Sequence, residues 1–303
     1  MQNLIFEIRK QLHVSQDELA KLLGVSFATV NRWENGHFAP NKAAELRLYE
    51  LCQNNRVDLE GIIRKRIRDA VAEVKIREGS IILYHGSKSG ITGPIAPVSR
   101  DRCDFGRGFY MGTDPFQHLT LISDFEEAKF YVISLDLADL RVLKVNSDIE
   151  WAMLVAFKRG KLDEIRGSAL YDRYRDMTQG WDVITGSIVS DVMFYALDNF
   201  FLGRITDKAL VKSLAAFPPG DQYVAVTGKA CSHAAIAAEL PLSHLERAFL
   251  RDLGAVNRKQ GVNLVSDICR NYRREGLFFD EILKSMAEEK ESGKQKGPAA
   301  GKG

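Results

Sequence analysis

The chain has 303 residues, which is enough for one large domain or two of ordinary size. Its apolar content of 45% and charged content of 27% are those of a soluble globular protein, and a net charge of +2 gives no global attraction to nucleic acid or to an anionic membrane. The four cysteines form no CxxC pair and no run approaches the roughly 18 apolar residues of a membrane span, so we expect free thiols, no metal site and no membrane partner. The first residues do not form a secretory leader, so a cytoplasmic location is expected.

The first fifty residues carry apolar side chains at helical spacing. Ser15 is predicted to cap a helix, because Glu18 follows three residues later and completes a capping box. Gly24 then permits a sharp turn, and Ser26 caps a further helix that ends at Gly36. Two short helices joined by a glycine turn predict an all-α helix-turn-helix domain over residues 1–55.

This segment closely resembles the Cro/repressor type of helix-turn-helix, which is found in many bacterial regulators and antitoxins. The resemblance covers roughly Leu4 to Leu51, and the matching residues are Ser15, Gln16, Glu18, Leu19, Ala20, Leu23, Gly24, Val25, Ser26, Thr29, Trp33, Glu34, Gly36 and Pro40. In that family the second helix enters the major groove of DNA. The resemblance therefore implies that the DNA-contacting residues are Gln16, Ser26, Phe27, Thr29, Asn31 and Arg32.

The sequence leaves open two questions about the expected DNA interface. Acidic and basic residues roughly balance, so phosphate attraction depends mainly on Lys21, Arg32 and Lys42, and on a homodimer that doubles the contacts. Phe27 either contacts a thymine methyl group or belongs to the core. The alternative to DNA binding is that the polar residues are solvated side chains on a small helical domain.

Residues 56–79 are predicted to form a helical connector. Apolar residues recur on one face at Ile62, Ile63, Ile67, Ala70, Val71 and Val74. The run RKRIR places positive charge on the other face. A solvated face on a linking helix is the favoured interpretation, and added DNA affinity or a dimer helix is the alternative.

From Ile81 onward the pattern becomes that of strands. Strands are predicted at IILYHGS, GFYM, YVISLDL, RVLKV, WDVITGSIV and QYVAVTG, with helices around residues 148–159, 162–177, 193–202 and 208–215. A mixed α+β domain is therefore expected over residues 80–240. Residues 241–288 are helical by pattern, and residues 289–303 are expected to be a disordered tail because they lack large apolar side chains.

Three fragments bring polar or aromatic groups to strand ends: Tyr84 to Ser87, Phe105 to Tyr110, and Asp221 to Val224. Their order resembles the ADP-ribosyltransferase fold of the diphtheria-toxin and poly(ADP-ribose) polymerase branch, which uses a His-Gly, a Gly-x-Gly-x-Tyr and a late glutamate. They are more similar to a bacterial family of ADP-ribosyltransferase-like proteins, often linked to toxin–antitoxin loci, in which glutamine commonly replaces that glutamate. The resemblance covers about residues 81–240.

The resemblance implies that NAD is the substrate and that the bond between nicotinamide and ribose is broken. It implies that His85 binds the adenosine ribose, that Gly86 binds the nicotinamide amide through its backbone, and that Tyr110 stacks on the cationic ring. Such a cation–π contact contributes roughly 0.5–2 kcal/mol. Ser87 and Arg107 complete the implied NAD-binding set, and His85, Tyr110 and Gln222 form the implied catalytic set.

Gln222 leaves the reaction open. A neutral amide binds a ribose hydroxyl but does not stabilise positive charge on the sugar, which is compatible with single-unit transfer, NAD hydrolysis or NAD binding alone. Asp191 is a candidate for the missing acid and equally a candidate helix N-cap.

The expected function is a DNA-binding protein with an NAD-dependent mono-ADP-ribosyltransferase domain that modifies an unidentified macromolecule. Its expected setting is a toxin–antitoxin or phage-defence locus. The alternatives are a transcriptional regulator that senses NAD or ADP-ribose without catalysis, and an NAD glycohydrolase.

Overall fold

The computed structural model describes residues 2–188, 191–216 and 220–285, and the predicted tail at 289–303 lies outside them. The chain forms two compact units. Unit 1 consists of the chain up to Thr92, Pro115–Ser134 and Ile236–Val256, and unit 2 consists of Gly93–Asp114, Leu135–Ala235 and the described residues from Asn257 on. The domain boundaries expected after residues 55, 79, 240 and 288 stay a prediction.

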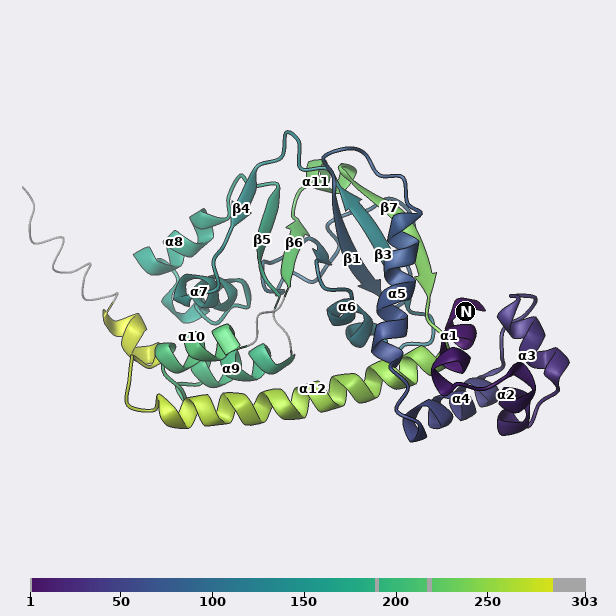
Figure 1. Ribbon diagram of the computed structural model, residues 1–303. Helices are drawn as coiled ribbons and strands as arrows, with labels where there is room; N and C mark the ends of the chain where they lie inside the picture. The colour runs from purple at the N-terminus through teal and green to yellow at the C-terminus, as the bar shows by residue number, and fades with distance from the viewer. Residues whose placement is uncertain (1, 189–190, 217–219, 286–303) are drawn as a thin grey trace, which may run out of the picture. The chain divides into compact units, whose positions relative to one another are not determined.

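Unit 1 begins with five helices: α1 (Gln2–Leu12), α2 (Gln16–Leu23), α3 (Phe27–Glu34), α4 (Lys42–Asn54) and α5 (Leu59–Ala72) (Figure 1). The expected signals begin and end α2: the Ser15 and Glu18 side chains form the capping box, and Gly24 adopts a left-handed φ of 66°. The Ser26 side chain accepts from the backbone N–H of Thr29 at the start of α3. The helix-turn-helix fold predicted from these residues is confirmed.

The hydrophobic core of this helical region includes residues of α12 (His244–Asn271), the longest helix among the described residues. The buried side chains are Leu4, Ile5, Ile8, Leu19, Leu23, Val30, Trp33 and Leu48, joined by Leu245 and Ala248 of α12. Glu45 of α4 accepts a 3.0 Å hydrogen bond from the backbone N–H of Leu245, so its carboxylate satisfies the first turn of α12. Burial raises the pKa of Glu45.

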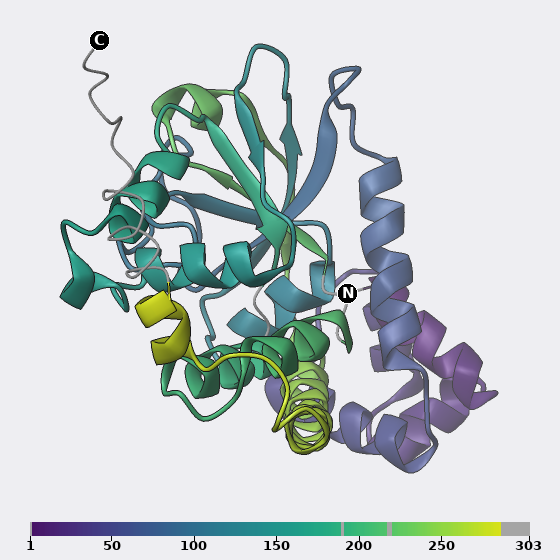
Figure 2. The same ribbon diagram turned by 90° about the vertical axis from the view of Figure 1, so that its left-hand side faces the viewer.

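The rest of unit 1 is built on three strands, β1 (Ile81–Ser87), β3 (Lys129–Leu135) and β7 (Ala234–Pro241), in the order β1-β3-β7. A buried cluster joins α5 and α6 (Pro115–Ile122) to these strands and consists of Ile63, Ile67, Phe116, Leu119, Ile122, Phe130 and Leu250. Figures 1 and 2 both show α5 beside β1. The predicted connector helix is therefore part of a packed layer.

Charges on the outer side of α5 are engaged in ion pairs. Arg64 pairs with Glu60 at 2.8 Å, and Lys65 pairs with Asp69 at 3.0 Å. Arg66, whose side chain is 17% exposed, pairs with the fully buried Glu246 at 2.7 Å. The exposed pairs of Arg64 and Lys65 agree with the solvated-face interpretation, whereas Arg66 forms a buried ion pair with Glu246 and does not belong to a solvated face.

Unit 2 contains four strands in the order β4-β5-β6-β2: β4 (Val142–Lys144), β5 (Val183–Ser187), β6 (Asp221–Ala225) and β2 (Phe109–Gly112). β4 and β5 run parallel, while β5–β6 and β6–β2 are antiparallel. Its helices include α7 (Ile149–Lys158), α8 (Ala169–Met177), α9 (Asp191–Phe201), α10 (Asp207–Ala216) and α11 (Gly228–Ser232), with a 3-10 turn at Asp163–Ile165. The predicted α+β class is confirmed.

The core of unit 2 gathers around aromatic residues of the helices and of the chain before β2. Trp151, Tyr174, Phe105 and Phe200 are each at most 1% exposed. Asp191, the candidate acid or cap, is the first residue of α9, and its side chain lies outside the described atoms. No helix in the described ranges is both long and apolar enough to cross a bilayer.

Candidate functional site

α3 has one face in the core and one face in solvent. Val30 is fully buried and Trp33 is 5% exposed, because helical spacing turns both inward. Phe27 is 52% exposed, so the interpretation of Phe27 as a core residue is wrong. Arg32 is exposed as well, and it has no ion-pair partner among the described residues. A bulky apolar ring and a cation therefore stand on the face that the sequence assigned to DNA.

The two hydroxyl groups at the start of α3 are partly used by the helix itself. The Ser26 hydroxyl accepts from the Thr29 backbone N–H at 3.2 Å and lies 2.8 Å from the Thr29 hydroxyl. These contacts cap α3 and fix both side chains. Among the predicted DNA-contacting residues of α3, Phe27, Asn31 and Arg32 take no part in this cap.

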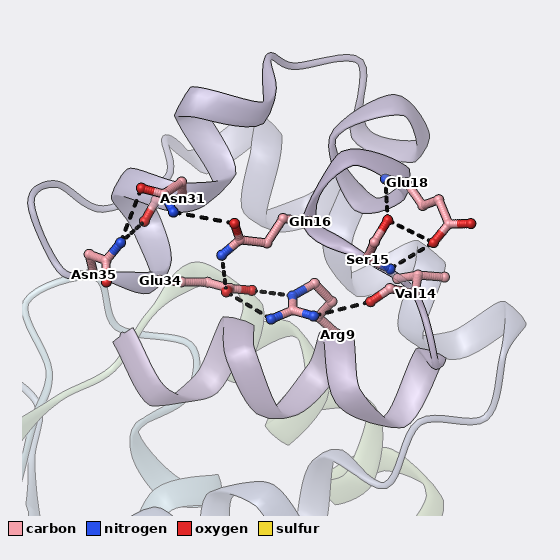
Figure 3. Close-up of polar contacts among 8 residues, drawn as sticks. All are labelled: Arg9, Val14, Ser15, Gln16, Glu18, Asn31, Glu34 and Asn35. Atoms are coloured by element: carbon pink, nitrogen blue, oxygen red, sulfur yellow. Dashed lines mark hydrogen bonds and ion pairs between the residues drawn. The ribbon is translucent and has the colours of Figure 1, made fainter.

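The buried carboxylate of Glu34 lies at the centre of the hydrogen bonds between α2 and α3 (Figure 3). Glu34 is 8% exposed and accepts from Arg9 Nε at 2.6 Å and Arg9 Nη2 at 3.1 Å. It also accepts from Gln16 Nε2 at 2.6 Å. The hydrogen bond to Glu34 raises the pKa of Arg9. This carboxylate therefore holds α1, α2 and α3 together.

The same chain of hydrogen bonds continues to the exposed face. Gln16 Oε1 accepts from Asn31 Nδ2 at 3.3 Å, and Asn35 Nδ2 donates to Asn31 Oδ1 at 3.1 Å. Two predicted DNA-contacting amides, on Gln16 and Asn31, are thus joined and oriented from Glu34. Sequence analysis matched Glu34 to the family but did not assign it this role, because its partners are 18 and 25 residues away.

Two of the three cations expected to attract phosphate lie beside carboxylates. Lys21 pairs with Asp17 at 2.6 Å, and Lys42 pairs with Glu126 at 2.9 Å. All four side chains are well exposed, so each pair is weak and open to exchange with a phosphate. Arg32 is the cation of this set whose charge is not already balanced.

β1 separates its two aromatic residues onto opposite faces. The Tyr84 ring stacks on Phe130, with centroids 5.6 Å apart, within the cluster shared with α5 and α6. Alternation along the strand turns His85 to the other face, where its ring centroid lies 6.3 Å from that of Tyr131. His85 therefore lies on the strand face opposite Tyr84, and its role in ligand binding stays a prediction.

Gly86 has a packing reason to be glycine. A Cβ atom there would lie 2.7 Å from the His118 carbonyl oxygen and 2.9 Å from Ile122 Cγ2, both on α6. Ser87, next along the chain, donates its hydroxyl to the Gly90 carbonyl at 2.9 Å. The close approach of α6 accounts for Gly86 without a ligand.

His118 is a buried histidine near His85 that sequence spacing did not single out. Its Nε2 atom has no hydrogen-bond partner among the described residues. Burial, together with the proximity of His85, lowers the pKa of His118 to about 3. His118 is therefore neutral at physiological pH.

Tyr110 closes the turn that precedes its own strand. Its hydroxyl donates to the Gly106 carbonyl at 2.6 Å and accepts from the Phe105 backbone N–H at 3.1 Å. Burial raises the pKa of this phenol. Arg107 instead extends outward: its side chain is 63% exposed and its Nε donates to the Pro97 carbonyl at 3.0 Å.

Tyr110 and Gln222 lie on one face of the β2–β6 ladder. Tyr110 is registered with Val224, and Gln222 is registered with Gly112 on one side and Gly186 on the other. Gln222 is 5% exposed, and its amide donates to the Ser187 carbonyl at 3.0 Å. The structure brings these two predicted residues together within unit 2. His85, Gly86 and Ser87 belong to unit 1.

Two family models match the chain. One, described as "Helix-turn-helix", matches residues 5–44 and so covers α1 to the start of α4. The other, "Protein of unknown function (DUF3990)", matches residues 81–235. No curated protein matches the chain. No solved structure matches it either. The second match spans just over half of the 303 residues, and the chain therefore belongs to the DUF3990 family and carries a helix-turn-helix before its DUF3990 domain.

Proposed function

We propose that this protein binds DNA through its helix-turn-helix and reads bases with α3. The observation that carries the proposal is the exposed face of α3, where Phe27 and Arg32 stand beside an Asn31 amide that is held by Gln16. Asparagine pairs with adenine through two hydrogen bonds, arginine pairs with guanine in the same way, and an aromatic ring packs on a thymine methyl group. The face therefore carries groups that distinguish bases as well as groups that bind phosphate.

Selection of duplexes from a random pool by the full-length protein tests this proposal. The wild-type pool defines a site, and Arg32→Ala is expected to relax the preference at one base pair by about 1–3 kcal/mol. Arg47→Ala is the matched control, because Arg47 is an exposed arginine of α4 outside the proposed face. Equal effects of the two variants, with no change at any single base, would mean that Arg32 binds DNA only by charge.

We further propose that the DUF3990 domain acts on NAD and transfers single ADP-ribose units. The proposal is supported by the ADP-ribosyltransferase resemblance and by the shared strand face of Tyr110 and Gln222. The acceptor's nucleophile would attack the ribose carbon, nicotinamide would leave, and the acceptor would lose a proton. His85 and Gly86 would bind the dinucleotide, and a homodimer would present two helix-turn-helix domains to an operator.

Gln222 favours a second candidate, a regulator that binds NAD or ADP-ribose without consuming it. The side chain is neutral and its amide is bonded to the Ser187 carbonyl, so it supplies no negative charge to an oxocarbenium-like sugar. An NAD glycohydrolase is the third candidate. A toxin–antitoxin or phage-defence setting rests on the resemblance alone.

Release of nicotinamide from labelled NAD separates these three candidates. A transferase releases nicotinamide only with an acceptor from cell lysate, and label then enters the protein, DNA or RNA fraction. A hydrolase releases it without an acceptor, and a sensor binds NAD and releases none. His85→Ala is the variant expected to abolish release, and Ser232→Ala, an exposed hydroxyl of α11, is the matched control.

A further inference from the structure

We propose that Lys158 binds the phosphate groups of an anionic ligand at the Gly-x-Gly-x-Tyr segment of unit 2. The sequence places Arg107 of the same segment in the implied NAD-binding set. The ligand class is a diphosphate, and its identity as NAD rests on the proposed function. The expectation of an anionic ligand comes from the Lys158 ammonium, which pairs with no carboxylate in the described part of the chain, and does not depend on NAD.

Lys158 is the last residue of α7 and its side chain lies along Gly106. A Cβ atom on Gly106 would come within 3.3 Å of Lys158 Cδ, and Gly106 has a φ of +80°, which favours glycine. The Gly106 carbonyl is also the acceptor of the Tyr110 hydroxyl. Lys158 and Tyr110 therefore meet the same glycine of this segment.

Three arginines around the segment have carboxylate partners. The pairs are Arg159–Asp104 at 2.9 Å, Arg102–Asp163 at 3.2 Å and Arg107–Asp101 at 4.0 Å. Lys158 differs, because its ammonium donates to the neutral Thr178 hydroxyl at 2.7 Å. It has no carboxylate partner among the described residues.

A partly buried ammonium without a carboxylate is costly to keep charged. Burial accordingly lowers the pKa of Lys158. An ammonium has three N–H donors, and the Thr178 hydroxyl takes one of them. The Phe157 ring, whose centroid is 5.5 Å from Lys158 Nζ, offers only a weak cation–π contact. Donors remain for phosphate oxygens, which would also supply the missing negative charge.

The helix ends near Lys158 give a competing explanation. Lys158 ends α7, and Thr178 is the C-cap residue of α8, so both helix C-termini contribute partial negative charge. If these partial charges alone stabilise the Lys158 ammonium, the lysine stabilises unit 2 and binds no ligand. The two explanations differ in what the side chain does to anion affinity.

Titration calorimetry of the full-length protein with inorganic pyrophosphate, and separately with NAD, tests the proposal. Lys158→Met keeps the length of the side chain and removes the charge. It should weaken pyrophosphate binding by about tenfold or more, since a hydrogen bond to a charged group commonly contributes that much. Lys144→Met is the matched control and should change the affinity by no more than about twofold, because Lys144 is an exposed lysine of β4 outside this segment.

Competitive acetylation of the wild-type protein gives a second readout that needs no variant. Pyrophosphate should protect Lys158 from acetic anhydride, while the exposed Lys144 of β4 should stay equally reactive. Affinity should also fall as the pH rises through the lowered pKa of Lys158, since the cation is then lost.

The outcomes separate this inference from the NAD proposal. Pyrophosphate binding that depends on Lys158, together with no NAD binding, overturns the NAD proposal and leaves the anion site. NAD binding that is unchanged in Lys158→Met, with Lys158 unprotected, overturns the anion site and leaves the NAD proposal. A wild-type protein that binds neither probe overturns both.

Discussion

Removal of the Glu34 carboxylate probes the chain of hydrogen bonds that supports α3. Glu34→Ala deletes an acceptor that is 8% exposed and that binds the Arg9 guanidinium and the Gln16 amide. Breaking a fully buried ion pair from one side costs about 3–5 kcal/mol. The Arg9 side chain is 17% exposed and keeps its 3.1 Å bond to the Val14 carbonyl, so part of its charge stays solvated. We therefore expect a loss of about 2–3 kcal/mol in the free energy of unfolding of this region.

Hydrogen exchange measured by mass spectrometry localises the effect. Peptides from α1 to α3 should lose protection by roughly 30–150-fold, which corresponds to the expected free energy, while peptides of unit 2 should stay unchanged. Glu50→Ala is the control, because Glu50 is an exposed carboxylate of α4 in the same region. Replacement of both Arg9 and Glu34 by methionine should cost less than Glu34→Ala, since no charge is left buried. Equal protection in Glu34→Ala and Glu50→Ala would refute the organising role of Glu34.

Three further changes have expected outcomes. Gly86→Ala should destabilise unit 1 by about 1–3 kcal/mol, because the new methyl group would lie 2.7 Å from a backbone carbonyl oxygen of α6. Thermal unfolding measures this loss, and the control Gly228→Ala should show none, because a methyl group there would enter open space. Tyr110→Phe should cost about 1–2 kcal/mol, because two hydrogen bonds to the 105–106 turn are lost, and unchanged exchange of that turn would contradict this. The raised pKa of Glu45 means that its ionised form is disfavoured in the fold, so stability falls as the pH rises from its unfolded pKa through its folded pKa. The melting temperature of Glu45→Gln should therefore rise relative to that of the wild type as the pH increases above the ordinary glutamate pKa of about 4.3, and a constant difference would count against this.

Local signals predicted the helical region well. Ser15, Glu18 and Gly24 act on backbone groups within a few residues, so the limits of α2 follow from the sequence. The exposure of Phe27 depends on how α3 rotates against α1 and α2, which no local signal specifies. The role of Glu34 depends on Arg9 and Gln16, which only the tertiary fold brings near.

In the remaining chain, strongly patterned strands were predicted and weakly patterned elements were not. IILYHGS and GFYM correspond to β1 and β2, which are rich in β-branched and aromatic residues. β7 has no predicted counterpart, because its sequence AAIAAELP has low strand propensity and forms a strand beside β3. α6 was also not predicted, so the reason for Gly86 was hidden. The contacts of Arg107, whose Nε donates to the Pro97 carbonyl and which lies 4.0 Å from Asp101, were not indicated by the sequence either, and its role in NAD binding stays a prediction.

Our main proposal for this protein is that the exposed face of α3 recognises DNA sequence. The most direct test is fluorescence anisotropy of the full-length protein with its selected duplex and with a scrambled duplex of equal length, at one fixed salt concentration. The selected duplex should bind at least about 10³-fold more tightly, as it does for sequence-specific proteins. Equal affinity for the two duplexes, falling in parallel as salt is added, would contradict it and reduce the helix-turn-helix to a charge-driven DNA contact.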